Sequence, residues 1–377
     1  MTTEALIAAI AARAATPPES ALALPPAAYR DETLHALERE RIFKRDWLCA
    51  GSANEIPKPG DYLTFAIDDQ PIVVVRGDDG VIRSFSNVCL HRMMRLAEGR
   101  GCARKFTCPY HAWTYDLRGR VVAVPHMKDA PNFRARDLAL PEIRTEVWHG
   151  WIYVTLNAEA PSVATQLEAL DPLVAPYQME NYIPVAAQDH IWATNWKVLT
   201  ENFMEGYHLP VTHRATVGAW MPVDSTRYPN AIHDGFTYQT FEKIEGATYG
   251  RAHPDNHRLE GAQRYTTVMP TVFPSHMYVL GPDHFWYLSL RPKGVGEVHV
   301  RFGISYAPEV HATLTDRESS VANLVAFFDK VNGEDRTVVE SVYANSNAPL
   351  AITGRLSWLE REINDFARYL ARRLKAA

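Results

Sequence analysis

The first long segment of the chain with a helical pattern covers residues 31–47. Its apolar residues Leu34, Leu37, Ile42 and Phe43 follow an approximately helical spacing. Asp31 precedes this stripe and can act as the N-cap, because a short carboxylate side chain accepts hydrogen bonds from the first free backbone N–H groups. The pattern therefore predicts one helix over residues 31–47.

From about residue 48 to residue 156 the pattern is typical of short strands. Apolar and polar residues alternate around Leu63, Phe65 and Ile67, and an apolar run covers residues 72–75. Turn-forming residues separate these runs, and further strand candidates cover residues 81–88 and 151–156. This segment is predicted to form a small antiparallel β domain.

After residue 157 the pattern is mixed. Alternation between residues 271 and 306 predicts paired strands, and residues 245–262 are polar and aperiodic, as expected for a loop over a binding site. Residues 195–208 are predicted to form a helix that stops before Pro210, because proline disfavours the helical conformation of the residue before it. Two more helices are predicted over residues 334–345 and 356–375.

Composition narrows the class of protein. The chain has 377 residues, which is typical of about two domains, and 46% of them are hydrophobic. The net charge of −5 argues against nucleic-acid binding, which needs a basic surface. No apolar run approaches the roughly 20 residues of a membrane span. Glu4 and Arg13 interrupt the apolar N-terminus, so we expect no signal peptide and a cytoplasmic location.

Two of the four cysteines stand close to histidines in a regular pattern. Cys89 and His91 are separated by one residue, sixteen residues follow, and Cys108 and His111 are then separated by two. A zinc finger usually pairs two cysteines, so a Cys-x-His pair is atypical of one. The pattern suits a [2Fe–2S] cluster in which two cysteines bind one iron and two histidines bind the other.

This arrangement, in the contexts NVCLHR and CPYHAW, resembles the Rieske iron–sulfur family. The resemblance implies that Cys89, His91, Cys108 and His111 bind the cluster. Cys102 lies between the two loops and matches no ligand position, and Cys49 is expected in the core. A structural zinc site that stabilises a binding module is the alternative.

A second group of candidate ligands lies in residues 195–213. His208 and His213 are five residues apart, so on one continuous helix they would point about 140° away from each other. Pro210 resolves this conflict if His208 ends the helix and His213 lies on the turned segment that follows. A carboxylate from elsewhere would complete a 2-His-1-carboxylate iron site with open positions for O₂.

The segment resembles the mononuclear iron site of Rieske non-haem iron oxygenases. The resemblance makes His208 and His213 iron ligands and places the third ligand at Asp335 in a C-terminal helix. The nearby carboxylates Asp329, Glu334 and Glu340 compete for that role. Asn202 is a candidate to form a hydrogen bond near the iron, with helix packing as the alternative.

The same resemblance gives Glu205 a role between the two metal centres. In the family, chains form a head-to-tail trimer, and an acidic residue joins an iron-ligand histidine to a cluster histidine of the neighbouring chain. Glu205 would therefore join His208 to His111 of the next subunit. Many ring-hydroxylating members use Asp, with one more residue after the asparagine. The shorter Asn202–Glu205 segment resembles the carnitine- and betaine-type monooxygenases.

Glu205-x-x-His208 also fits the di-iron carboxylate motif, but so do Glu32-x-x-His35 and Glu146-x-x-His149.

The resemblance implies an α+β fold in three parts. Residues 1–44 would form a helical segment that packs on the catalytic domain, and residues 45–156 an antiparallel β Rieske domain. Residues 157–377 would form a catalytic domain of the helix-grip type, with an antiparallel sheet and a C-terminal helix.

The implied reaction is the hydroxylation or demethylation of a small organic substrate with O₂. No Gly-x-Gly-x-x-Gly motif follows a strand, so the electrons of NAD(P)H must come through a separate reductase, with or without a ferredoxin. Alternatives are cis-dihydroxylation of an aromatic ring, and an electron carrier without oxygenase activity. Aromatic and methionine residues in several segments could line the substrate pocket: Phe203, Met204, Trp220, His276, Met277, Phe285 and Trp286.

Overall fold

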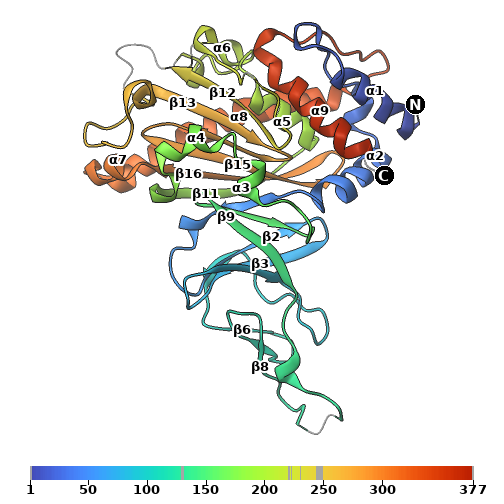
Figure 1. The fold of residues 1–377 in the computed structure, drawn as a ribbon, viewed down its shortest axis with the longest axis vertical. Helices are drawn as coiled ribbons and strands as arrows, with labels where there is room; N and C mark the ends of the chain where they lie inside the picture. The colour runs from blue at the N-terminus through green and yellow to red at the C-terminus, as the bar shows by residue number, and fades with distance from the viewer. Residues whose placement is uncertain are drawn as a thin grey trace. The chain divides into compact units, whose positions relative to one another are not determined.

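The computed structural model describes residues 2–128, 131–219, 221, 223–229, 231–242 and 249–375. The chain divides into two compact units (Figure 1). Residues Phe43–Val163 form one unit, and residues Met1–Ile42 together with Ala164–Ala377 form the other. None of the described helices is both long enough and apolar enough to cross a membrane.

The unit of residues 43–163 is built from antiparallel strands, as the alternating pattern predicts. Seven strands form one sheet in the order β1-β10-β9-β4-β3-β2-β5. Three short strands, β6, β7 and β8, form a second sheet. The strands are β1 Leu48–Ser52, β2 Asp61–Ile67, β3 Gln70–Arg76, β4 Ile82–Ser86, β5 Arg100–Cys102, β6 Phe106–Thr107, β7 Thr114–Tyr115, β8 Val121–Ala123, β9 Glu142–Trp148 and β10 Trp151–Thr155.

The apolar residues of the predicted alternation are core residues of this unit. Leu63, Phe65 and Ile67 on β2 are buried, and the residues between them are only partly buried. Phe65 pairs with Ile72 on β3, where residues 72–75 are all buried. One face of β2 is therefore covered, and the run 72–75 shows that β3 is buried on both faces, since successive side chains of a strand point to opposite sides.

The other unit contains a six-stranded antiparallel sheet in the order β11-β16-β15-β14-β13-β12. Its strands are β11 Ile183–Trp192, β12 Phe236–Glu242, β13 Thr266–Val272, β14 His276–Leu280, β15 His284–Gly294 and β16 Glu297–Tyr306. The described helices are α1 Thr3–Ala14, α2 Glu32–Glu38, α3 Val163–Gln166 at the boundary, α4 Asp171–Val174, α5 Trp196–Met204, α6 Leu209–Thr212, α7 Pro308–Thr313, α8 Arg317–Asn345 and α9 Arg361–Lys375.

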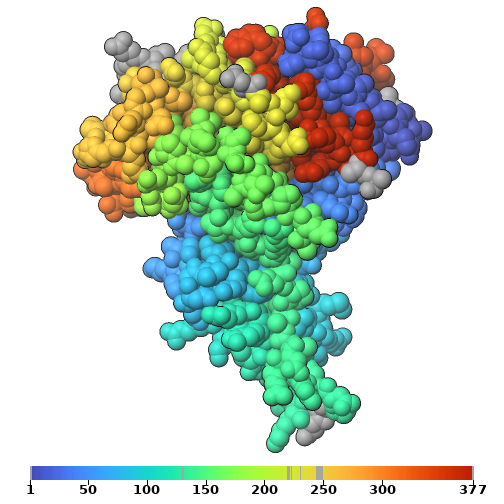
Figure 2. Space-filling model, in the orientation of Figure 1, coloured from blue at the N-terminus to red at the C-terminus, as the bar shows by residue number. Residues whose placement is uncertain are grey.

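Helices from the two ends of the chain lie side by side in this unit. The N-terminal helix α1 contacts the C-terminal helix α9, and Figure 2 shows the corresponding blue and red surfaces next to each other. Leu6 and Ile10 of α1 are buried, and Asn364 on α9 donates to the carbonyl oxygen of Arg13 at 3.4 Å. The antiparallel sheets and the C-terminal helix agree with the predicted α+β fold.

Three helix boundaries differ from those that the sequence pattern predicts. Asp31 caps α2 as expected, with its carboxylate 2.6 Å from the backbone N of Leu34, but α2 ends at Glu38 and a π-helical turn covers Arg39–Phe43. The predicted helix over 334–345 is the C-terminal part of the longer α8. The helix predicted over 356–375 is a 3₁₀ turn at Trp358–Glu360 followed by α9.

The prediction that a helix reaches residue 208 is wrong. Helix α5 ends at Met204, and Glu205 has an extended backbone with φ −117° and ψ 154°. The carboxylate of Glu205 accepts hydrogen bonds from the backbone N–H groups of Tyr207 and His208. A side chain that binds the backbone locally competes with helix continuation, so the chain turns here and α6 starts at Leu209, with Pro210 in its first turn.

The predicted loop over residues 245–262 is partly described. Residues 245–248 lie outside the described part of the chain. Residues 249–260 contain no helix or strand, and a 3₁₀ turn starts at Gly261.

Helix α5 carries a glutamate whose proton affects stability. Tyr29 donates a hydrogen bond of 2.8 Å to Oε2 of Glu201, while Oε1 is buried without a hydrogen-bond partner among the described residues. Burial raises the pKa of Glu201 to about 7, although the Tyr29 hydrogen bond and Lys197 act in the opposite direction. An unfolded glutamate titrates near pH 4.3, so the folded state holds a proton that the unfolded chain loses between about pH 4.3 and 7.

The free energy of unfolding contributed by Glu201 therefore falls as the pH rises through this window. The side chain of Glu201→Gln stays neutral at both pH 5 and pH 8. We therefore predict that the difference in free energy of unfolding between Glu201→Gln and the natural chain shifts in favour of the variant by about 2 kcal/mol from pH 5 to pH 8. Urea unfolding at both pH values measures the difference, with the exposed Glu4→Gln as the control. An equal difference at pH 5 and pH 8 would contradict the prediction.

Candidate functional site

Two loops in the β unit have the same local structure. The backbone N–H of Cys89 donates to Met94, and that of Met93 donates back to the Cys89 carbonyl. In the second loop the N–H of Cys108 donates to Trp113, and that of Ala112 donates back to the Cys108 carbonyl. Met93 and Ala112 occupy the same place in each turn and both have a positive φ, of 56° and 58°. Each loop thus presents one cysteine and one histidine from the same kind of turn.

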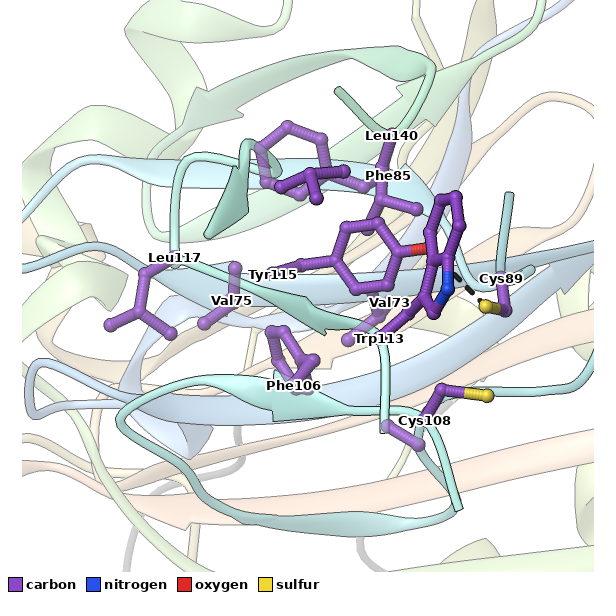
Figure 3. Packing of buried hydrophobic residues seen from close by; sticks show 12 residues of the cluster. Val73, Val75, Phe85, Cys89, Phe106, Cys108, Trp113, Tyr115, Leu117 and Leu140 are labelled. Atoms are coloured by element: carbon purple, nitrogen blue, oxygen red, sulfur yellow. Dashed lines mark hydrogen bonds between the residues drawn. The ribbon is translucent and has the colours of Figure 1, made fainter. Parts of the chain in front are cut away.

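The four predicted cluster residues come together at these two loops. Both Cys89 and Cys108 are 2% exposed, both thiols are free, and their sulfur atoms lie at the same edge of the buried cluster in Figure 3. The rings of His91 and His111 have centroids 4.6 Å apart. A set of two buried sulfurs and two imidazoles fits a [2Fe–2S] cluster with mixed ligands.

Two aromatic residues support this site, although spacing alone does not identify them. The hydroxyl group of Tyr115 lies 3.3 Å from Sγ of Cys89 and accepts a hydrogen bond from the N–H of Leu90 (Figure 3). Burial, together with Cys89, holds the pKa of Tyr115 well above its usual value, so the hydroxyl keeps its proton. The ring of Trp113 stacks on His91 with centroids 5.1 Å apart.

The other two cysteines lie apart from these loops in the structure. Cys49 is fully buried in β1, which agrees with the expectation that it is a core residue. Cys102 is exposed at the end of β5.

A second group of ligand atoms forms in the larger unit. One ligand atom each of His208, His213 and Asp335 lies within 4.8 Å of the others. The Nε2 atoms of both rings face the same carboxylate oxygen: Oδ1 of Asp335 is 3.0 Å from His213 and 3.6 Å from His208. This arrangement of two imidazoles and one carboxylate fits a divalent metal such as iron.

A glutamate holds each imidazole from the opposite side. Nδ1 of His208 lies 2.5 Å from Oε1 of Glu205, and Nδ1 of His213 lies 2.8 Å from Oε2 of Glu334. Such carboxylate partners fix the tautomer of a metal-binding histidine, with the proton on Nδ1 and a lone pair on Nε2. Nε2 of each ring would thus be available to a metal that Asp335 also binds, and without a metal Nε2 of His213 forms a hydrogen bond of 3.0 Å with Asp335.

The competing carboxylates have other partners in the structure. Besides His213, Glu334 accepts a hydrogen bond of 2.6 Å from the hydroxyl of Thr216. Burial alone would raise the pKa of Glu334, but the hydrogen bonds from Thr216 and His213 lower it below its usual value. Glu340 accepts a hydrogen bond from Ala193 N and another from Arg336, and Asp329 lines a different surface pocket.

The candidate metal ligands His208, His213 and Asp335 line a largely apolar cavity of about 550 Å³, a volume that includes its open mouth. Asn202 and two of the predicted aromatic residues, Phe203 and Trp286, line it. Met204, His276, Met277 and Phe285 are not among the lining residues, and Trp220 lies outside the described part of the chain. The described lining residues are Asn202, Phe203, His208, Leu209, His213, Val217, Met221, Tyr249, Thr267, Met269, Val279, Gly281, His284, Trp286, Val331 and Asp335.

Comparison with known families covers both units. The family "Ring hydroxylating alpha subunit (catalytic domain)" matches residues 179–376, and the "Rieske [2Fe-2S] domain" matches residues 46–134. A glycine betaine monooxygenase oxygenase subunit of Chromohalobacter salexigens is 39% identical over 210 residues, which are 55% of this chain and 47% of the relative. The chain spans about half the length of the curated relatives to which it is first matched, the glycine betaine monooxygenase oxygenase subunits.

Two other comparisons cover nearly the whole chain. The chloroplastic choline monooxygenase of Spinacia oleracea is 26% identical over 370 residues, which are 95% of this chain and 80% of the relative. The crystal structure of the quaternary ammonium Rieske monooxygenase CntA with L-carnitine is 24% identical, has a TM-score of 0.81, and covers 95% of this chain and 97% of that one. This structural similarity shows that the fold is the same.

The position of Glu334 behind His213 leads to a test of metal affinity. We predict that Glu334→Gln weakens Fe²⁺ binding by about tenfold or more, because removal of a carboxylate behind a ligating imidazole typically costs 10- to 100-fold. Glu340→Gln, on the same helix but turned to Ala193 and Arg336, is the matched control. Fe²⁺ titration of protein with an intact cluster gives the affinities. Equal affinities of the two variants would show that Glu334 does not support the metal site.

Proposed function

Because the chain belongs to the ring-hydroxylating alpha subunit family and carries a Rieske [2Fe-2S] domain before the catalytic domain, we propose that it is a terminal oxygenase component. It would use O₂ and electrons from a separate reductase to hydroxylate or demethylate a small organic substrate. The observation that carries this proposal is the convergence of His208, His213 and Asp335 on one point at the cavity wall. An electron carrier without oxygenase activity has no need of that second metal site.

Two cofactors fit the donor sets. Cys89, Cys108, His91 and His111 would hold the cluster, and His208, His213 and Asp335 would hold a mononuclear iron. When bound, these centres supply one-electron transfer and O₂ activation.

The chain's own residues prepare this chemistry in two ways. Glu205 and Glu334 keep the proton of each imidazole on Nδ1, so that Nε2 of His208 and His213 remains available to a metal. The apolar cavity wall excludes water and orients a substrate beside the metal-binding residues. Asn202 lines the same cavity and would contact the substrate through its amide.

Partners follow from the same proposal. Without a nucleotide-binding motif, the chain would receive electrons of NAD(P)H from a reductase, with or without a ferredoxin, in the cytoplasm. The chain would also assemble as a homotrimer in which Glu205 joins His208 to His111 of the neighbouring subunit. The contact between Glu205 and His208 within one chain supports the first half of this link.

The substrate class is proposed from the relatives. Their names specify glycine betaine, choline and carnitine, which are small quaternary ammonium compounds. Aromatic rings of Phe203 and Trp286 in the cavity wall can stabilise such a cation by cation–π contacts. We therefore propose monooxygenation of a quaternary ammonium compound, and cis-diol formation from an aromatic substrate would contradict it.

Substitution of His208 tests the function directly. We predict that His208→Ala reduces substrate-dependent O₂ consumption to background in assays with a surrogate reductase, because the metal loses one of its three ligands. The iron content should fall by about one per chain, while the visible spectrum of the cluster persists.

His190→Ala is the control, since His190 lies on β11, outside the cavity that the metal-binding residues line. It should retain both activity and iron. Continued oxygenation by His208→Ala would refute the assignment of the site.

A further inference from the structure

A hydrogen-bonded row of three side chains lies in the wall of the same cavity, and the proposed metal site does not use it. The hydroxyl of Tyr249 lies 2.6 Å from Nε2 of His284. Nδ1 of His284 lies 2.8 Å from Oδ1 of Asp283. Tyr249 and His284 both line the cavity, and Asp283 is not among its lining residues.

The fold holds this row in place. Asp283 and His284 stand where the turn after β14 enters β15, and the hydroxyl of Tyr182 donates to the carbonyl of Gly281 in this turn at 3.1 Å. The second oxygen of Asp283 accepts a hydrogen bond of 2.8 Å from the backbone N–H of Gly250, next to Tyr249. The carboxylate thus fixes both ends of the row.

The hydrogen bonds determine where the protons lie. Burial alone would raise the pKa of Asp283, but His284 and the N–H of Gly250 lower it below its usual value, so the carboxyl is ionised. An ionised Asp283 accepts the proton of Nδ1, which leaves Nε2 of His284 as an acceptor. The hydroxyl hydrogen of Tyr249 then points at Nε2, and the phenol oxygen offers only lone pairs to any other partner.

The rest of the cavity offers little to a carboxylate. None of its described lining residues is a lysine or arginine. Apart from the candidate metal ligands, the described side chains with polar atoms that line it are those of Asn202, Tyr249, Thr267, His284 and Trp286. A substrate group that donates a hydrogen bond can therefore bind the phenol oxygen of Tyr249, whereas a group that only accepts does not find a donor in Tyr249.

We infer that Tyr249, oriented by His284 and Asp283, is a specificity-determining residue that accepts a hydrogen bond from a hydroxyl or N–H group of the substrate. His284 and Asp283 are positioning residues, because they act through Tyr249. This inference rests on the proposed function only in taking the cavity as the substrate site. It predicts a preference among ligands that can be measured without turnover.

The test uses pairs of ligands in which one member carries a hydroxyl group where the other carries a methyl group. Choline is compared with propyltrimethylammonium, and benzyl alcohol with ethylbenzene, by calorimetric titration of the metal-loaded protein. We predict that the hydroxyl-bearing member of a pair binds about tenfold more tightly, because only that member donates a hydrogen bond to the phenol oxygen. In Tyr249→Phe the ratio should fall to about one. The control Tyr238→Phe, on β12 outside the cavity, should keep the ratio of the natural chain.

Asp283→Asn separates orientation from simple contact. It keeps the size of the side chain but removes the charge that fixes the imidazole tautomer, so the ratio should also fall towards one. A ratio of affinities near one in the natural chain for both pairs would overturn the inference. Failure of the natural chain to bind any member of either pair would also overturn it. A ratio that Tyr249→Phe leaves unchanged would do the same. Loss of the proposed function would appear separately, as absent iron or sulfide in the same protein preparation.

Discussion

The candidate metal site depends on one constraint: two imidazoles must present the same ring nitrogen, Nε2, to a metal that one carboxylate also binds. A free histidine can place its proton on either nitrogen, and only the tautomer with the proton on Nδ1 leaves Nε2 for a metal. Glu205 and Glu334 impose that tautomer on His208 and His213 from opposite sides. The third partner, Asp335, follows Glu334 directly on α8, where consecutive side chains diverge by about 100°. One helix would therefore supply both a ligand to the metal, Asp335, and the residue that supports His213, Glu334.

The end of helix α5 makes this arrangement possible. Glu205 leaves the helical conformation, and its carboxylate binds the next backbone N–H groups and His208 together. The N–H of Gly206 donates to the carbonyl of Leu359, which ties the extended segment to the turn before α9. The same residue thus ends the helix, starts the following turn and holds the imidazole of His208.

Much of the fold and of the two candidate ligand sets could be predicted from residue types and spacing. The alternation over residues 63–67 predicted the antiparallel sheet of the first unit, and the two Cys/His pairs predicted the loops that the structure brings together. The sequence pattern predicts the end of α5 four residues too late, because Glu205 binds the following backbone N–H groups and ends the helix well before Pro210. Helix α8 was predicted only from residue 334, although the apolar residues of the segment 321–328 already have helical spacing. The row that ends in Tyr249 joins residues up to 35 positions apart through tertiary contacts, which no local pattern indicates.

The two ligand sets imply that one chain holds two different iron centres, and metal analysis distinguishes this from a zinc-stabilised module and from an electron carrier with the cluster alone. Iron, zinc and acid-labile sulfide would be measured per chain on protein purified without oxygen. We expect about three irons and two sulfides, two irons from the cluster and one from the site at His208, His213 and Asp335. Zinc without sulfide would contradict the cluster assignment, and two irons with two sulfides would contradict the mononuclear site.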